Sequence, residues 1–441
     1  RLVYDEHDRL TDMISLEDGS EVARTTMSYE GGQSQPSRIV DGEGGRTDMV
    51  WDGTLLLEVT DPTGVRARFA YDEHGDLVAS TDAAGNTTRV VRDGSGRAVE
   101  LIMPSGATTR FAYDAAGLLT RRVDPDGAAW SYEYSAAGRL RAMVDPLGAR
   151  TALEYGENGE PAATIDPLGR RVEQELDDLG NVSRVRLPDG AVWEFTHDAM
   201  SRLRQTVDPS GGVWTRHYDR FGRPSGTTDP TGVRSFQRYS DARREVTAGD
   251  AAGATTGRMD KWGRRGEFVD AAGGRTRIER DAAGRPVRIR RPGGGSVRYD
   301  YDECGRVAGV RGAMGWRTEL GYDADSQLIR EVWPTGERGW IRYDRCGRVI
   351  ESADPDGGTT LFERDAAGRV VRVTMASGAS YTYEYDGAGR WCASVSTGGA
   401  RYEIGYDADG NIATETWPTG EVVVTEHDRC GRPVRRVEPG A

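Results

Sequence analysis

The chain repeats itself at a regular interval of about 21 residues, and this period limits its fold more than any other feature. A Tyr-Asp-x-x-Gly motif starts well-preserved copies at Tyr71, Tyr113, Tyr301, Tyr343 and Tyr385. With its degenerate copies, the motif forms eighteen consecutive units, of which one is shorter than the rest by a single residue. Such a period is typical of a repeat array, in which each unit is one supersecondary element. We therefore expect one continuous array in place of three ordinary domains of about 150 residues.

The first part of the chain, before Tyr71, carries a looser version of the same repeat. Candidate motif starts at Tyr4, Tyr29 and Trp51 are unevenly spaced, and the regular units follow from Tyr71. The sequence shows no linker and no domain boundary. The expected organisation is irregular repeats of the Tyr-Asp type over residues 1–70 and a regular repeat array over residues 71–441, with no separate catalytic domain.

Each unit carries two turn signals, half a unit apart. The first is the Asp-x-x-Gly of the motif, as in Asp114–Gly117, where the Asp side chain can bond to nearby backbone and Gly can adopt a positive φ. The second is an Asp-Pro-x-Gly segment, as in Asp124–Gly127 and Asp208–Gly211, which suits a type I turn followed by a glycine bulge. Two turns in each unit leave two strands of about six residues. One unit therefore predicts one hairpin step of an antiparallel sheet.

Alternation within the strands predicts which face of the sheet is packed. Large rings occupy every second position of two strands, at Trp130, Tyr132, Tyr134, Tyr381, Tyr383 and Tyr385. Because alternate strand residues point to the same side, these rings are expected to share the packed or concave face. The position two residues before the motif start is also apolar in most units, from Phe69 to Ile404.

A flat sheet of some forty strands would expose an apolar face too large for a soluble protein. Gly and Pro interrupt every window of ten residues, so no helix is available to cover that face. We therefore expect an all-β fold, in which tandem β-hairpin repeats of about 21 residues form a long antiparallel sheet that spirals around a partly hollow, polar interior. Unpaired outer strands near Leu2–Tyr4 and Val422–Thr425 are expected to recruit other strands.

Composition and charge exclude several classes of function. The net charge is -13, from 71 acidic and 58 basic residues, which argues against a nucleic-acid partner because such proteins usually concentrate positive charge. No run approaches the length of about 18 apolar residues that a membrane-spanning helix needs, so no such helix is expected. Hydrophobic residues make up 37% of the chain and 59 residues are glycine, which favours an array over a densely packed globule.

The Tyr-Asp-x-x-Gly-Arg motif with its second Asp-Pro-x-Gly turn resembles the RHS/YD repeat of bacterial polymorphic toxins, insecticidal toxin complexes and the teneurins. The match is good over residues 71–441 and loose over residues 1–70. The resemblance implies a β-sheet ribbon that spirals into a hollow shell, a cocoon that holds a carboxy-terminal toxin domain away from the producing cell. It also implies a bacterial protein made in the cytoplasm and then secreted or displayed at the cell surface.

The resemblance further implies partners that lie outside these residues. The main one is the C-terminal toxin domain of the same polypeptide, and a secretion-system component or a glycan is a further possible partner. Family toxins release the toxin domain by an aspartyl-type self-cleavage in a core that follows the last repeat, but the array still repeats at Cys430–Arg432. Asp145–Gly148 and Asp166–Gly169 superficially resemble that core. They occupy the ordinary second-turn position, so we interpret them as turns.

The four cysteines do not predict a disulfide or a zinc site. Cys304, Cys346 and Cys430 occupy the same motif position in units two and four repeats apart, about 19 Å or more along the sheet, whereas a disulfide needs Cα atoms within about 7 Å. Cys392 lies in a strand, and no Cys-x-x-Cys pair occurs. Free thiols are the expected state.

Three other sequence patterns resemble known sites, and each has a simpler interpretation. Asp407–Asn411 faintly resembles a calcium loop but lacks the glycine and glutamate at the required positions, so it is interpreted as a first turn. His197 and His427 replace the motif tyrosine and are interpreted as packed rings, although the nearness of His427 to Cys430 leaves a catalytic pair as a minor alternative. The Asn86-Thr87-Thr88 and Asn181-Val182-Ser183 sequons are expected by chance at this length.

The sequence thus predicts no catalytic residue, no metal site and no cofactor, and it leaves the binding residues unknown. Our leading hypothesis is a structural encapsulation segment of a secreted bacterial RHS-repeat toxin. The alternative is a cell-surface adhesion or glycan-binding module, because rows of aromatic and arginine side chains could bind sugars. An enzyme is the third hypothesis.

Overall fold

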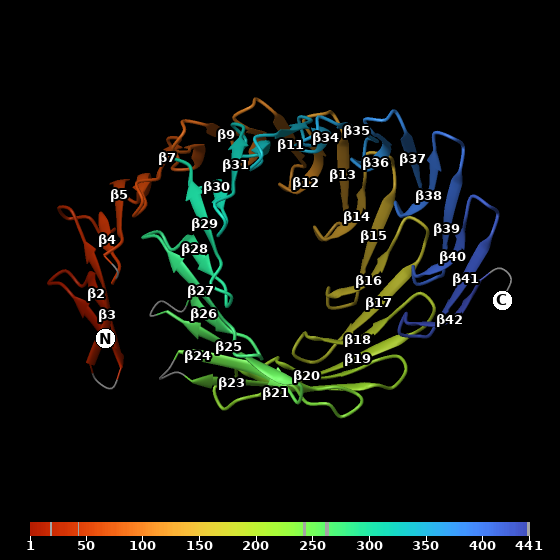
Figure 1. The fold of residues 1–441 in the computed structure, drawn as a ribbon, viewed down its shortest axis with the longest axis horizontal. Coiled ribbons are helices and arrows are strands. Elements are labelled where there is room, and N and C mark those ends of the chain that lie inside the picture. The colour runs from red at the N-terminus through yellow and green to blue at the C-terminus, as the bar shows by residue number, and fades with distance from the viewer. Residues whose placement is uncertain (18–19, 43, 241–243, 261–263, 439–441) are drawn as a thin grey trace. The chain divides into compact units, whose positions relative to one another are not determined.

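The computed structural model describes residues 1–17, 20–42, 44–240, 244–260 and 264–438. These residues contain no helix and form 42 β-strands, drawn as consecutive arrows in Figure 1. The predicted all-β fold of tandem hairpins is therefore confirmed. None of the described residues forms a helix long and apolar enough to cross a membrane.

The chain divides into two compact units, and each unit combines two segments that are distant in the sequence. Unit 1 contains residues 1–109 and 237–340, and unit 2 contains residues 110–236 and 341–441. We call the two segments of a unit its first and second ribbons.

In unit 1, every strand belongs to one of these two ribbons. The first ribbon contains β1 (Leu2–Tyr4), β2 (Leu10–Glu17), β3 (Ser20–Ser28), β4 (Arg38–Val40), β5 (Arg46–Asp52), β6 (Leu55–Thr60), β7 (Arg66–Tyr71), β8 (Leu77–Thr81), β9 (Thr87–Arg92) and β10 (Ala98–Ile102). The second contains β23 (Phe236–Ser240), β24 (Glu245–Asp250), β25 (Gly253–Met259), β26 (Arg265–Val269), β27 (Arg275–Arg280), β28 (Pro286–Arg290), β29 (Ser296–Tyr301), β30 (Val307–Arg311), β31 (Arg317–Tyr322) and β32 (Leu328–Val332).

Unit 2 has the same construction. Its first ribbon contains β12 (Leu119–Val123), β13 (Ala129–Tyr134), β14 (Leu140–Val144), β15 (Arg150–Tyr155), β16 (Pro161–Ile165), β17 (Arg171–Leu176), β18 (Val182–Arg186), β19 (Val192–His197), β20 (Leu203–Val207), β21 (Val213–Tyr218) and β22 (Pro224–Thr228). Its second contains β34 (Val349–Ala353), β35 (Thr359–Arg364), β36 (Val370–Thr374), β37 (Ser380–Tyr385), β38 (Trp391–Ser396), β39 (Arg401–Tyr406), β40 (Ile412–Thr416), β41 (Val422–His427) and β42 (Pro433–Val437). β11 (Thr108–Tyr113) and β33 (Arg338–Tyr343) cross the limits of the units, and β23 begins at Phe236, the last residue of the first ribbon of unit 2.

Strands that follow one another along a ribbon pair antiparallel, and the two kinds of turn leave different registers. Across a first turn, Tyr134 of β13 pairs with Leu140 of β14, and a β-bulge precedes this pair. Across a second turn, Val123 of β12 pairs with Ala129 of β13 without a bulge. Because a bulge bends and twists its strand, each repeat adds curvature at its first-turn end.

Both predicted turns are present where the sequence places them. In the second turn at Asp208, the Asp Oδ1 accepts the backbone N–H groups of Ser210 and Gly212 at 2.9 and 2.8 Å. Pro209 lies in the turn between strands, and Gly211 adopts a φ of 84°. Such a positive φ is the reason why this position of the turn is glycine in most repeats.

The face of the sheet that carries the alternating aromatic rings is half-buried and not fully buried. Tyr132 and Tyr134 are half-buried while Glu133 between them is exposed, as the alternation predicts. In β37, Tyr383 and Tyr385 are half-buried, but Tyr381 is 37% exposed, so its predicted burial is wrong. Tyr381 is the second residue of β37. The hydroxyl of Thr397 hydrogen-bonds the backbone N–H and carbonyl oxygen of the preceding residue, Ser380. No large side chain of the described residues is fully buried, so each ribbon is a single layer without a deep core.

Three of the best-buried apolar residues are alanines. They lie under ion pairs on the face of the sheet that carries Glu133 and Arg150. Ala142 of β14 is 0% exposed and pairs with Glu133 and Ala152 of the strands on either side. Arg150 of β15 bonds Glu133 of β13 at 2.7 Å and therefore spans the alanine between them. The same arrangement places Ala163 between Glu154 and Arg171, and Ala393 between Glu384 and Arg401.

The outer strands differ in part from the expectation. Among the described residues, β1 pairs with β2, as expected for an outer strand at Leu2–Tyr4. Val422–Thr425 is not an outer strand, because β41 pairs with β40 on one side and with β42 on the other. The residues after Cys430 are mostly polar and give only a weak strand signal in the sequence, yet they form β42.

Candidate functional site

The motif tyrosine joins each repeat to the repeat before it. The hydroxyl of Tyr134 donates to the carbonyl oxygen of Leu119 at 2.9 Å, and that of Tyr155 donates to Leu140 at 2.8 Å. In each case the acceptor lies 15 residues earlier, at the start of the strand after the preceding first turn. The same bond is made by Tyr71, Tyr218, Tyr301, Tyr322, Tyr385 and Tyr406.

The motif aspartate and arginine form the other half of this joint. Asp302 accepts the backbone N–H and the Nε–H of Arg306, each at 2.8 Å. The guanidinium of Arg306 then lies over the ring of Tyr322 in the next repeat, 4.7 Å from its centre. We call this arrangement, a turn Asp held by Arg with the Arg stacked on the next aromatic ring, the repeat joint. The Asp, Arg and Tyr side chains of the motif thus all make structural contacts in this joint.

Electrostatics in the first turns stabilise the ionised aspartates. Hydrogen bonds from Arg202 lower the pKa of Asp198 to about 2, against the opposing effect of desolvation. The turn carboxylates are therefore acceptors at neutral pH, as the joint requires.

The two ribbons of unit 1 meet turn to turn, along a line that we call the seam. The backbone N–H of Ser105, in a second turn of the first ribbon, donates to Asp325 in a first turn of the second ribbon at 2.9 Å. The Cys304 thiol donates to Asp82 at 3.4 Å. The joined residues are 220 or 222 positions apart.

Unit 2 has a seam of the same kind. The N–H of Asp189 donates to Asp409 at 2.9 Å, and the Ser210 hydroxyl lies 3.1 Å from the Cys430 sulfur. Both pairs are again 220 residues apart. In both units, the third residue of a second turn thus meets the third residue of a first turn ten and a half repeats later. The ribbon therefore returns alongside itself.

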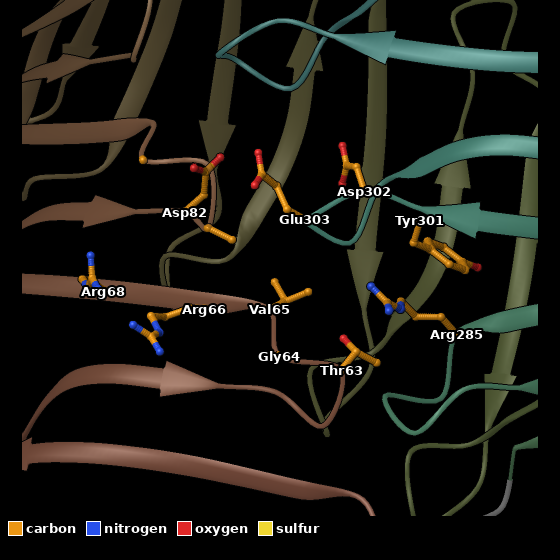
Figure 2. Close-up of a pocket in the computed structure, with 12 residues that line it drawn as sticks. Thr63, Gly64, Val65, Arg66, Arg68, Asp82, Arg285, Tyr301, Asp302 and Glu303 are labelled. Carbon is orange, nitrogen blue, oxygen red and sulfur yellow. The ribbon is translucent and has the colours of Figure 1, made fainter.

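A polar cavity of about 560 Å³ lies in the seam of unit 1. Figure 2 shows the residues that line it. Thr63, Val65 and Asp82 come from the first ribbon, and Arg285 and Tyr301 come from the second. Its arginines are already engaged: Arg66 and Arg68 pair with Glu58, and Arg285 holds Asp281 and stacks on Tyr301. The cavity is a gap between joints and presents no converging set of ligands.

Unit 2 carries a row of aromatic rings. Trp391 lies 6.2 Å from Tyr383 and 5.9 Å from Tyr402 between ring centres, and Tyr402 lies 5.2 Å from Trp417. Burial and a hydrogen bond to Glu415 raise the pKa of Tyr402 to about 12. An apolar groove of about 350 Å³ adjoins the row, lined by Phe362, Val370, Val373, Tyr383, Tyr385 and Trp391.

Comparison with protein families identifies the repeat. The RHS repeat model matches residues 51–88, 92–129, 134–171, 177–213, 201–234, 280–315, 343–380 and 364–401, which is more than half of the chain. The chain belongs to the RHS repeat family. No curated protein matches the sequence significantly.

Solved structures share the fold of this RHS repeat chain. The pore structure of the Photorhabdus luminescens Tc holotoxin contains a chain with a TM-score of 0.64 and 14% identity, and the match covers 96% of this chain and 30% of that one. The TcdB2-TccC3 complex gives 0.62 at 12% identity, covering 100% and 35%. A TcdB2-TccC3-TEV structure gives 0.55 at 12%, covering 97% and 36%. The chain thus spans about a third of the length of these proteins.

The cysteines of the RHS repeats are free, as expected. Cys304, Cys346 and Cys430 lie in first turns at the seam, and burial raises the pKa of the Cys304 and Cys346 thiols. Burial likewise raises the pKa of Cys392 in β38. Their seam partners could not be found from the sequence, because an offset of 220 residues or more has no local signal.

The residues of the calcium-like loop, the motif histidines and the sequons all lie in or next to first or second turns. Asp407 accepts the backbone N–H groups of Asp409 and Asn411, like other first turns. His427 is 11% exposed with its Nδ1 directed to Asp407 at 3.7 Å, whereas Cys430 faces the seam. The sequon residues Asn86 and Asn181 donate their side-chain amides to Asp82 and Asp177, respectively.

Proposed function

We propose that this chain is a structural encapsulation segment of a secreted bacterial RHS-repeat toxin, which encloses a C-terminal toxin domain of the same polypeptide. The observation that carries the proposal is the seam, because within each unit the ribbon returns alongside itself and bonds to itself, as the wall of a container would. The fold likeness to Tc toxin structures supports the same proposal. In this proposal the RHS repeat sheet spirals around a hollow interior, residues 1–70 start the array, and the chain performs no catalysis.

The proposal includes a location and a set of partners. The protein is made in the cytoplasm and is then secreted or displayed at the cell surface, with a secretion-system component as a further partner. The single-layer construction supports a wall in preference to a catalytic domain, because the side chains that recur in each repeat hold turns and strands together.

The test uses the natural gene product that contains these residues. Native digestion with trypsin, followed by mass spectrometry, should leave peptides of the toxin domain uncut until the array is unfolded. The seam variant Asp126→Asn, which removes the ion pair with Arg348 but leaves Arg348 on its own turn aspartate Asp344, should increase cleavage of the toxin domain. A toxin domain that is cut as fast in the gene product as in isolation would refute encapsulation.

The second candidate is adhesion through glycan binding, and one observation favours it. Trp417 is 44% exposed beside Tyr402, and exposed aromatic rings can stack on sugars. A glycan array would detect binding that Trp417→Ala abolishes and that Trp316→Ala, a change of another exposed tryptophan, leaves unchanged. Absence of any bound glycan would reject this candidate.

A further inference from the structure

Two of the repeat joints carry the same pair of replacements, an asparagine for the motif arginine and a histidine for the next motif aromatic residue. In the eighteen repeats, asparagine takes the place of the motif arginine at two positions, Asn181 and Asn411. Histidine takes the place of the motif aromatic residue at two positions, His197 and His427. Each histidine starts the repeat directly after the one that carries the asparagine. The arginine and the ring on which it would stack are therefore replaced as a pair.

The structure shows what the paired replacement does to the charges of the joint. In an ordinary joint, the turn aspartate is neutralised by the arginine four residues later, as Asp198 is by Arg202 at 2.8 Å. In the altered joints, Asn181 donates its amide to Asp177 and Asn411 donates its amide to Asp407, but an amide carries no charge. The aspartate has lost its permanent cation.

The histidine of the next repeat lies where it can supply that cation. The Nδ1 of His197 is 3.6 Å from Asp177 Oδ2, and the Nδ1 of His427 is 3.7 Å from Asp407 Oδ2. The two side chains are only 12% and 11% exposed, and neither Nδ1 has a hydrogen-bond partner among the described residues. Protonation of the imidazole adds a positive charge to a ring whose Nδ1 already faces the carboxylate.

Other charged groups near the two histidines do not replace this interaction. Around His197, Arg202 and Arg204 both bind Asp198, and Glu194 on the same strand binds Arg184. Around His427, Glu426 binds Arg435.

The turn beside His427 also meets the seam. Asp409 in this turn accepts the N–H of Asp189. Arg170 and Arg390 reach the same turn at Gly410, while each holds its own turn aspartate. The carboxylate of Asp407 remains the group that His427 Nδ1 faces.

We propose that the joints at His197 and His427 are acid-strengthened latches in unit 2. Proton uptake on the histidine places a positive charge beside the carboxylate and closes an ion pair with Asp177 or Asp407. Joints that keep the arginine, such as Asp198–Arg202 and Asp302–Arg306, stay charged both in mild acid and at neutral pH. Mild acid therefore tightens two specific joints of the array, whereas neutral pH loosens them. This inference does not depend on what the array encloses.

Hydrogen exchange on the full chain tests the proposal. The amides of Leu179 and Asn181 are bonded to Asp177, so they report whether the first joint is closed. After correction for intrinsic exchange, their protection should rise about two- to fivefold from pH 7.5 to pH 5.5, the range expected for a partly exposed ion pair. The amide of Met200, which is bonded to Asp198 in an arginine joint, should not change.

A double variant is the matched control. Asn181→Arg with His197→Tyr rebuilds an ordinary joint and should remove the pH dependence at Leu179 while keeping the high protection. His197→Gln should give low protection at both pH values. The proposal is overturned if wild-type protection at Leu179 is equal at both pH values, or if the double variant keeps the pH dependence. Nuclear magnetic resonance of the imidazole protons must also show His197 titrating in this range, and a ring that stays neutral at pH 5 contradicts the latch.

Discussion

At the scale of the residue, the motif is a set of structural contacts. The tyrosine hydroxyl reaches a carbonyl oxygen 15 residues earlier, the aspartate closes its own turn, and the arginine links the turn to the next ring. The tyrosine and arginine contacts join neighbouring repeats, which explains why the motif recurs along the array. The sequence predicted the turns from Asp and Gly because those preferences are local. It could not predict the hydroxyl and guanidinium contacts, which join different repeats.

Loss of one motif hydroxyl should have a measurable cost. Tyr322→Phe removes the bond to the carbonyl of Val307, so the free energy of unfolding should fall by about 0.5–1.5 kcal/mol. Tyr132→Phe is the control, because the hydroxyl of Tyr132 makes no hydrogen bond among the described residues. Denaturant titration of both variants would measure the difference. Equal costs for the two changes would remove the hydroxyl bond from the account.

The turn glycines give a prediction of the opposite sign. Ser201 and Ser326 occupy the glycine position of their first turns with φ values of 57° and 64°. Because serine is strained in this region, Ser201→Gly should stabilise the array by about 0.4–1 kcal/mol. The reverse change Gly127→Ser, at a φ of 92° with open space around the position, should destabilise it. Thermal unfolding of the two variants provides the check, and a loss of stability in Ser201→Gly would show that the serine side chain has a role of its own.

At the scale of the element, strands and hairpins were predictable because their signals recur within every repeat. Burial was less so. Tyr381 has the alternation of a packed ring, yet it is exposed at the beginning of its strand, where it is the second residue after a turn. The buried alanines were also missed, since Ala142 is small on a face that the pattern marks as polar. Only the pairing of strands on either side shows that Glu133 and Arg150 meet above it.

Filling the space under such an ion pair should therefore be costly. Ala142→Leu places a branched side chain at a site that is 0% exposed and separates Glu133 from Arg150. We expect a loss of about 1–3 kcal/mol in unfolding free energy. Ala70→Leu, at an exposed position of β7, should change stability by less than about 0.5 kcal/mol. Urea unfolding compares the two, and a neutral Ala142→Leu would mean that the ion pair does not span the alanine in solution.

The first turns also predict how the ribbons respond to strong acid. The pKa of Asp198 is lowered to about 2 by Arg202, so its folded-state pKa lies below its unfolded value. A carboxyl group of this kind stabilises the fold above the unfolded pKa of about 4, and this contribution is lost as pH falls toward 2. The midpoint of thermal unfolding should fall between pH 5 and pH 2, and Asp198→Asn should make this fall shallower. A melting temperature that is constant over this range would contradict the turn chemistry.

At the scale of the whole molecule, the seam is the feature that sequence reasoning could not reach. The offset of 220 residues depends on how much each bulged hairpin bends the ribbon, and no residue type encodes that sum. The third positions of the turns vary freely along the sequence, from Cys304 to Asp325, yet in the structure they face partners one coil away. The expected open edge at Val422–Thr425 failed for a local reason, because β42 covers it.

In both units the ribbon bonds to itself 220 residues later, and the proposed wall depends on these bonds. The most direct test uses Ser210, whose hydroxyl oxygen lies 3.1 Å from the native Cys430 sulfur. After mild oxidation, Ser210→Cys should form a disulfide with Cys430, identified by mass spectrometry of non-reduced peptides. Ser377→Cys, at the same turn position one ribbon later, should stay reduced because it is exposed and has no seam cysteine to face. A Ser210→Cys protein that remains fully reduced, or that pairs with Cys304 or Cys346 instead, would contradict the seam and the wall built on it.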